Sequence, residues 1–93
     1  MKKARRVQRE FDQLRKALPR TKQIIASTKD SRLWDHEASL RKKIKTLRSL
    51  YWADLEGYDE VLAGYIDLLD AVSVRLLNEY NRQKGTNYTF EEV

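Results

Sequence analysis

Residues 51–78 consist of four consecutive blocks of seven residues, YWADLEG, YDEVLAG, YIDLLDA and VSVRLLN. The first position of the blocks is Tyr, Tyr, Tyr and Val, and the fifth position is Leu in all four. Apolar residues at alternating steps of three and four are typical of a helix that packs along another helix. The repeat therefore predicts a helical seam, which consists of Leu55, Tyr58, Leu62, Tyr65, Leu69, Val72 and Leu76.

Gly57 decides how much of this repeat belongs to a single helix. Gly57 can end one helix, with Asp59 capping the next. Its equivalence to Gly64 in the repeat also allows a place inside a helix, at about 1 kcal/mol relative to alanine. A turn predicts an all-α fold, an antiparallel three-helix bundle. The alternative is a helical hairpin whose long C-terminal helix, from about residue 32 to 84, dimerises. We favour the bundle, because helices average about 11–12 residues.

Two further helices are expected before residue 51. In the first, apolar residues share one face, namely Val7, Phe11, Leu14, Leu18 and Ile25. Pro19 interrupts this helix and predicts a kink or a restart, because it removes a hydrogen bond at a cost of about 3 kcal/mol. Residues 27–31 predict a loop, in which Asp30 or Ser31 caps the next helix. The second helix is expected to bury Leu33, Leu40, Ile44, Leu47 and Tyr51.

The length and composition fit one small helical domain. The chain has 93 residues with 3 Gly and 1 Pro, which leaves little material for the turns of an all-β fold. Gly85 follows Arg82 and Lys84, a pattern typical of a helix C-terminus. We therefore expect a single domain over residues 1–85 and a C-terminal tail over residues 86–93.

The sequence contains few residues that could support enzyme catalysis. It has no cysteine, which excludes disulfides and cysteine-based zinc sites. Its one histidine, His36, would have Arg32, Leu33, Ser39 and Leu40 as helical neighbours, and none of these is an acid or a metal ligand. We predict a non-enzymatic protein with no catalytic residue, metal or cofactor.

The cellular location is predicted from the N-terminus and from hydropathy. The basic residues 1–6 are followed by polar and charged residues instead of the apolar run of a signal peptide. No apolar stretch approaches the 18–20 or so residues that a membrane span requires. A cytoplasmic protein without a membrane span is expected.

Charge is divided unevenly between the two halves of the chain. Residues 1–50 contain 16 Lys and Arg against 5 Asp and Glu, whereas residues 51–93 contain 3 against 9. Such asymmetry favours contact with nucleic acid or another polyanion, such as an acidic protein surface, although a solvated or internally neutralised face is an equally simple interpretation. Two basic stripes could line a phosphate track, with Trp34 or Trp52 stacking on a base. The predicted phosphate-binding residues are Arg5, Arg6, Arg9, Arg41, Lys42, Lys45 and Arg48.

The competing hypothesis is a protein-interaction module, such as an adaptor, inhibitor or assembly subunit, that uses the seam. Tyr and Trp are enriched at the centres of interfaces, and small residues beside the seam would let a partner helix approach closely. The same tyrosines could instead form the core, with each hydroxyl at the edge of the bundle. The predicted interface consists of Tyr51, Trp52, Tyr58, Leu62 and Tyr65, and a homo-oligomer is compatible with it.

Overall fold

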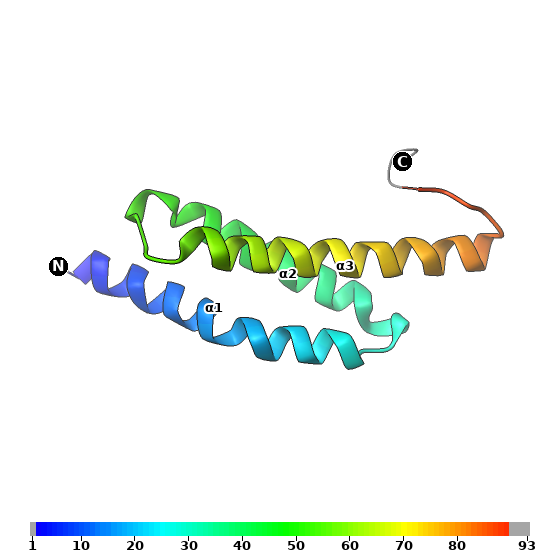
Figure 1. Cartoon of the computed structure of the whole chain (residues 1–93), viewed down its shortest axis with the longest axis horizontal. Coiled ribbons are helices and arrows are strands. Elements are labelled where there is room, and N and C mark those ends of the chain that lie inside the picture. The colour runs from blue at the N-terminus through cyan, green and yellow to red at the C-terminus, as the bar shows by residue number, and fades with distance from the viewer. Residues whose placement is uncertain (1, 90–93) are drawn as a thin grey trace.

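The computed structural model describes the backbone of residues 2–89 and the side chains of residues 5–89 (Figure 1). Three long helices and two short 3-10 helices make up this part of the chain, and it contains no strand. In chain order they are α1 (Lys2–Ser27), η1 (Asp30–Arg32), α2 (Leu33–Ser49), η2 (Tyr51–Ala53) and α3 (Tyr58–Lys84). The predicted all-α three-helix bundle is confirmed, with α2 packed along α3 and α1 beside both.

The chain turns at Gly57 as predicted, so the alternative of one long helix is wrong. Gly57 has a φ of +76°, a left-handed conformation that glycine adopts without a steric penalty. Its carbonyl accepts the first hydrogen bond of α3, from the Val61 amide at 3.1 Å. Gly57 itself is the N-cap residue, and Asp59 lies in the first turn of α3 instead of capping it. A carboxylate there still favours the helix through the macrodipole.

α1 continues through Pro19, so the predicted restart of the helix does not occur. The helix axis does change direction along α1, in agreement with the predicted kink (Figure 1). Proline has no amide hydrogen for the carbonyl of Arg15 and crowds the preceding turn. In that turn, the hydroxyl of Tyr65 on α3 donates to the carbonyl oxygen of Leu14 at 2.6 Å. This bond ties α1 to α3 close to the bend.

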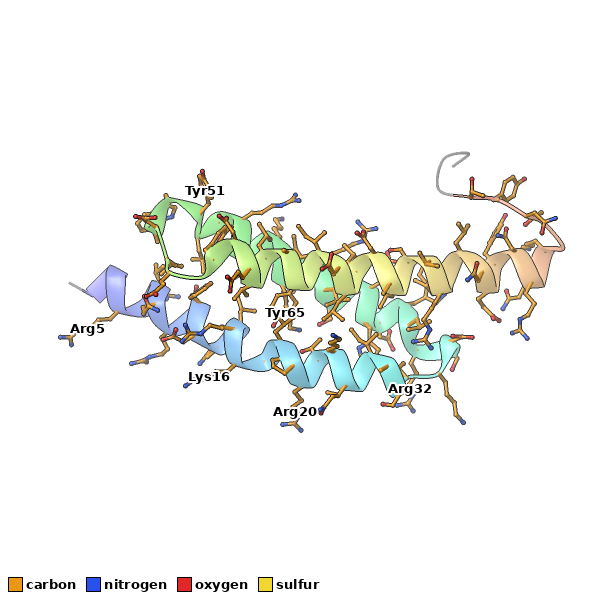
Figure 2. The ribbon with its side chains drawn as sticks, viewed as in Figure 1. Arg5, Lys16, Arg20, Arg32, Tyr51 and Tyr65 are labelled. Atoms are coloured by element: carbon orange, nitrogen blue, oxygen red, sulfur yellow. The ribbon has the colours of Figure 1, made fainter. Side chains whose placement is uncertain are left out.

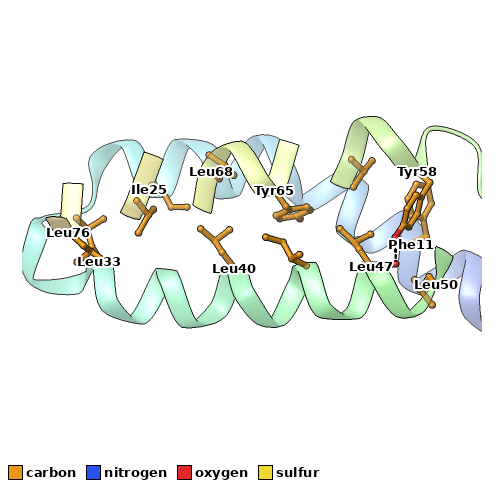
Figure 3. Packing of buried hydrophobic residues seen from close by; sticks show 13 residues of the cluster. Phe11, Ile25, Leu33, Leu40, Leu47, Leu50, Tyr58, Tyr65, Leu68 and Leu76 are labelled. Atoms are coloured by element: carbon orange, nitrogen blue, oxygen red, sulfur yellow. Dashed lines mark hydrogen bonds between the residues drawn. The ribbon is translucent and has the colours of Figure 1, made fainter. Parts of the chain in front are cut away.

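The core runs along the middle of the bundle (Figure 3). Its buried members are Phe11, Ile25, Leu33, Leu40, Ile44, Leu47, Leu50, Tyr58, Val61, Tyr65, Leu68, Val72 and Leu76. Four of the seven predicted seam residues are buried, namely Tyr58, Tyr65, Val72 and Leu76. The other three, Leu55, Leu62 and Leu69, are only half-buried. Val61 and Leu68 are buried in addition. The buried stripe of α3 is wider than a heptad seam because α3 packs against two helices.

Tyr51 was expected on the buried face of α2, and this expectation is wrong. α2 ends at Ser49, and the chain then changes direction in η2, so the periodicity of α2 no longer applies to Tyr51. Leu50 is buried instead, whereas Tyr51 is 73% exposed. The aromatic side chains of η2 consequently point into solvent at the corner between α2 and α3.

The bundle is elongated, with extents of 56 × 26 × 17 Å and a radius of gyration of 15.6 Å. A compact chain of this length has a radius of gyration of about 12 Å. The C-terminal turns of α3 project beyond the α1–α2 connection (Figure 1). α3 stops at Gly85, with a φ of +66°, and the Thr86 amide donates to the Asn81 carbonyl at 3.0 Å in a Schellman arrangement. The predicted end of the last helix is confirmed.

Candidate functional site

A row of positively charged side chains without acidic partners lies along the outer side of α1. Arg5, Lys16 and Arg20 point away from α3 in Figure 2, and Arg9, one helical turn after Arg5, shares their face. We call these four residues the basic ridge. All four are exposed. Arg5 and Arg20 are fifteen positions apart, so the ridge extends over about 22 Å of helix.

The acidic residues of α1 do not neutralise this ridge. Glu10 pairs with Arg6 at 3.8 Å, and Asp12 pairs with Arg15 at 3.2 Å. Within residues 5–89, no salt bridge involves a member of the basic ridge. Arg6, which the sequence analysis grouped with the phosphate-binding residues, therefore has an acidic partner within its own helix.

Asp67 and Asp70 are exposed to solvent on α3, whereas the basic ridge lies on α1. The bundle measures 26 × 17 Å across, whereas electrostatic interactions in water are screened over about 10 Å at 0.1 M salt. Screening over this distance weakens the effect of Asp67 and Asp70 on the ridge.

The predicted basic residues of α2 occupy another side of the molecule. Arg41 pairs with Glu37 at 3.0 Å and lines a shallow depression with Leu69 and Asp70 of α3. Arg48 lies near Tyr58, where its charge opposes the rise in the pKa of that hydroxyl. Arg41 and Arg48 thus lie beside residues of α3, whereas the basic ridge points away from α3. Lys42 and Lys45 are exposed on α2.

The predicted interface residues divide into two groups. Tyr65 is completely buried and Tyr58 is 7% exposed, so both belong to the core and neither offers a surface to a partner in this fold. Burial raises the pKa of both hydroxyls. Tyr58 donates to the carbonyl of Leu47 at 2.5 Å, a bond drawn in Figure 3. Tyr51 and Trp52 are the exposed members, and Leu62 is half-buried.

His36 and Arg75 form a polar network at the α1–α2 connection. The Thr28 hydroxyl lies 3.0 Å from Nε2 of His36 and donates to the Ile24 carbonyl at 2.6 Å. Arg75 of α3 donates to the carbonyls of Ile25 and Thr28, at 3.0 and 2.6 Å. The sequence analysis missed this role of Arg75, because its partners lie 47 to 50 residues away in the chain. The network holds the fold together, and it uses the one histidine of the sequence.

Metal and membrane sites find no support in the described part of the chain. No cluster of three or more His, Asp or Glu side chains is arranged to hold a metal ion among those residues. None of the helices described combines the length and apolar character needed to cross a bilayer. Comparison of the chain with protein-family models, with curated proteins and with solved structures finds no match in any of the three.

Proposed function

We propose that this protein is a non-enzymatic nucleic-acid-binding module that contacts phosphates through the basic ridge of α1. The observation that carries the proposal is the set of four exposed cations on one helical face, free of salt bridges within residues 5–89. Lys and Arg that neutralise phosphates release condensed counterions, and this release supplies most of the affinity of sequence-independent binding.

The composition of the ridge favours recognition of the phosphate backbone over recognition of bases. The one aromatic residue of α1, Phe11, is buried, so α1 offers no ring for stacking on an unpaired base. Contacts from arginine and lysine to phosphates position a protein on a duplex without reading its sequence. We therefore expect duplex binding with little dependence on base sequence.

The salt dependence of binding gives the direct test. Four phosphate contacts predict that log K falls with log salt at a slope of about −3.6 for duplex DNA, or roughly a 100-fold loss of affinity between 50 and 200 mM salt. Fluorescence anisotropy with labelled 20-base-pair duplex DNA, duplex RNA and the corresponding single strands measures this slope. Absence of binding to every probe at 50 mM salt would overturn the proposal.

Two matched charge reversals identify the helix that binds. The double variant Arg9→Glu and Lys16→Glu removes the middle of the basic ridge and is expected to abolish measurable binding. The control, Lys42→Glu and Lys45→Glu, changes the net charge by the same amount on α2 and is expected to retain most of the affinity. Equal losses in both variants would mean that net charge alone drives association, which contradicts a role for the ridge.

A further inference from the structure

The corner between α2 and α3 leaves most of two aromatic side chains exposed to solvent. Tyr51 and Trp52 of η2 are 73% and 69% exposed, although Leu50, immediately before them, is buried. Aromatic side chains at a solvent-exposed turn present a large apolar area to water, which favours contact with a partner. We call the surface formed by η2 and the first turn of α3 the aromatic corner (Figure 2).

The aromatic corner is connected directly to the core. The ring of Tyr51 packs edge-on against Tyr58, with ring centroids 6.0 Å apart and an interplanar angle of 66°. Tyr58 in turn stacks with Phe11 at 6.2 Å and is held by its hydrogen bond to Leu47. Tyr51 is therefore supported from behind by a buried ring, and a ligand that contacts it would not have to order a mobile loop first.

The hollow at this corner is acidic as well as aromatic. It is open to solvent, has a volume of about 540 Å³, and is lined by Tyr51 and Trp52 together with the carboxylates of Asp54, Asp59 and Glu60. None of its lining residues is basic, and within residues 5–89 none of the three carboxylates forms a salt bridge. The carboxylates repel anions and attract cations. The aromatic rings also attract cations, because the face of an aromatic ring carries partial negative charge.

We propose that the aromatic corner binds a lysine or arginine side chain in a basic segment of a partner protein. The three carboxylates are not arranged to converge on a single metal ion, whereas a long organic cation can place its aliphatic stem on Trp52 and its charge among the carboxylates. The attraction between a cation and an aromatic face is stronger when the cation is removed from water. This proposal is independent of the nucleic-acid function, because it uses the opposite charge on different helices.

The two tryptophans of the chain make the test internally controlled. Trp34, near the start of α2, is 62% exposed but lies outside the hollow. In two-dimensional ¹H–¹⁵N spectra the indole N–H groups of Trp34 and Trp52 give separate signals. Titration with the peptide Ac-GSRKSG-amide is expected to move the Trp52 signal in a saturable manner and leave the Trp34 signal in place. The matched peptide Ac-GSQQSG-amide is expected to move neither.

Variants then assign the binding energy to the hollow. Trp52→Ala, followed through the backbone amides of residues 54–60, is expected to weaken binding of the basic peptide about two- to fivefold, the range for a cation on an exposed aromatic face. The pair Asp59→Asn and Glu60→Gln is expected to weaken it several-fold. Trp34→Ala is the control and is expected to leave the affinity unchanged.

Three outcomes would overturn the proposal. Equal binding of the two peptides would show that the corner is a purely apolar surface. The absence of any shift of the Trp52 signal up to 10 mM peptide would show that the hollow does not bind such cations. A Trp52 signal that moves with protein concentration alone, together with dimers in sedimentation velocity, would assign the corner to a second copy of this chain.

Discussion

The two connections between the helices are built in opposite ways. The first, residues 28–32, is held from α3 by Arg75, whose guanidinium reaches two backbone carbonyls and also the carboxylate of Asp30 at 3.1 Å. The second, residues 50–57, reverses the chain through two residues with left-handed backbone, Asp54 and Gly57, and leaves its aromatic side chains in solvent. The first connection is held by hydrogen bonds to its polar groups, whereas the second buries Leu50 and exposes most of Tyr51 and Trp52.

This difference separates what the bundle needs for stability from what it offers to a partner. A partly buried network that loses its guanidinium loses hydrogen bonds to a charged group, so changes at the first connection act on stability. Exposed aromatic rings contribute little to folding, so changes at the second connection act chiefly on binding. Substitutions at matched positions of the two connections test this separation.

The largest expected effect comes from the core residue that anchors the first connection. Leu33 is completely buried at the start of α2, and Leu33→Ala should lower the free energy of unfolding by about 2–5 kcal/mol. Urea denaturation followed by circular dichroism measures this loss. The adjacent Trp34→Ala is the control and should change the free energy by less than about 0.5 kcal/mol. A loss below 1 kcal/mol for Leu33→Ala would contradict the assigned packing.

The next largest effect concerns the guanidinium that spans the first connection. Arg75→Met keeps the aliphatic stem but removes three hydrogen bonds, and it should destabilise the fold by about 1–3 kcal/mol. Thermal denaturation at fixed ionic strength measures the change. Arg82→Met is the comparison, because Arg82 pairs with Glu79 on the solvent-exposed part of α3 and its loss should change the stability much less. Equal effects of the two variants would show that the hydrogen bonds of Arg75 stabilise the fold no more than an ordinary surface ion pair.

The backbone of the second connection gives a pair of opposite effects. Gly57→Ala places a Cβ on a residue with a φ of +76°, although the side chain would meet no atom within 4 Å, and it should cost about 1 kcal/mol. Asp54→Gly relieves a left-handed non-glycine residue, with a φ of +50°, and should stabilise the fold by a fraction of that amount. Chemical denaturation of the two variants side by side checks both signs.

The hydroxyl of Tyr58 joins the second connection to the core and makes stability depend on pH. Burial raises the pKa of this hydroxyl above its ordinary value of 10.0, so the folded state favours the protonated form. The resulting stabilisation is complete below pH 10 and is lost as the pH rises through the folded-state pKa. Tyr58→Phe should cost about 0.5–1.5 kcal/mol at pH 7, and the free energy of unfolding should fall less steeply above pH 10 in the variant than in the parent protein.

The smallest expected effect on stability comes from the aromatic corner itself. Trp52→Ala removes a side chain that is 69% exposed, and the free energy of unfolding should change by less than about 0.5 kcal/mol. Differential scanning calorimetry of parent and variant checks this expectation. A loss of 2 kcal/mol or more would assign Trp52 to the fold and weaken its assignment to a binding surface.

The sequence predicted most of the fold because local signals and apolar periodicity agreed. Gly57 lies in the turn before α3 and Gly85 ends α3, as expected. The apolar spacing correctly predicted that Phe11, Leu33 and Leu40 are buried. The placement of Tyr51 failed because the repeat continues in the sequence past the point where α2 ends. Periodicity describes a helix and cannot show where the helix stops when no Gly or Pro marks the end.

The candidate sites were less accessible to prediction from sequence, because they depend on which helices are neighbours. Arg41 and Arg9 look alike in the sequence, yet Arg41 lies beside α3 with an acidic partner and Arg9 faces solvent on α1. The hollow at the aromatic corner likewise requires the turn at Gly57 to bring Asp59 and Glu60 beside Trp52. Charge counts identified the basic half of the chain, and the structure shows which of its cations have acidic partners.

The Arg75 clamp also has a consequence for the order of folding. Its hydrogen bonds join residues 45 to 50 positions apart, so a large loop must close before any of them can form. Contacts between distant parts of a chain that form after the transition state affect the unfolding rate more than the folding rate. We therefore expect these bonds to form late, so that Arg75→Met raises the unfolding rate of the bundle and leaves its folding rate nearly unchanged.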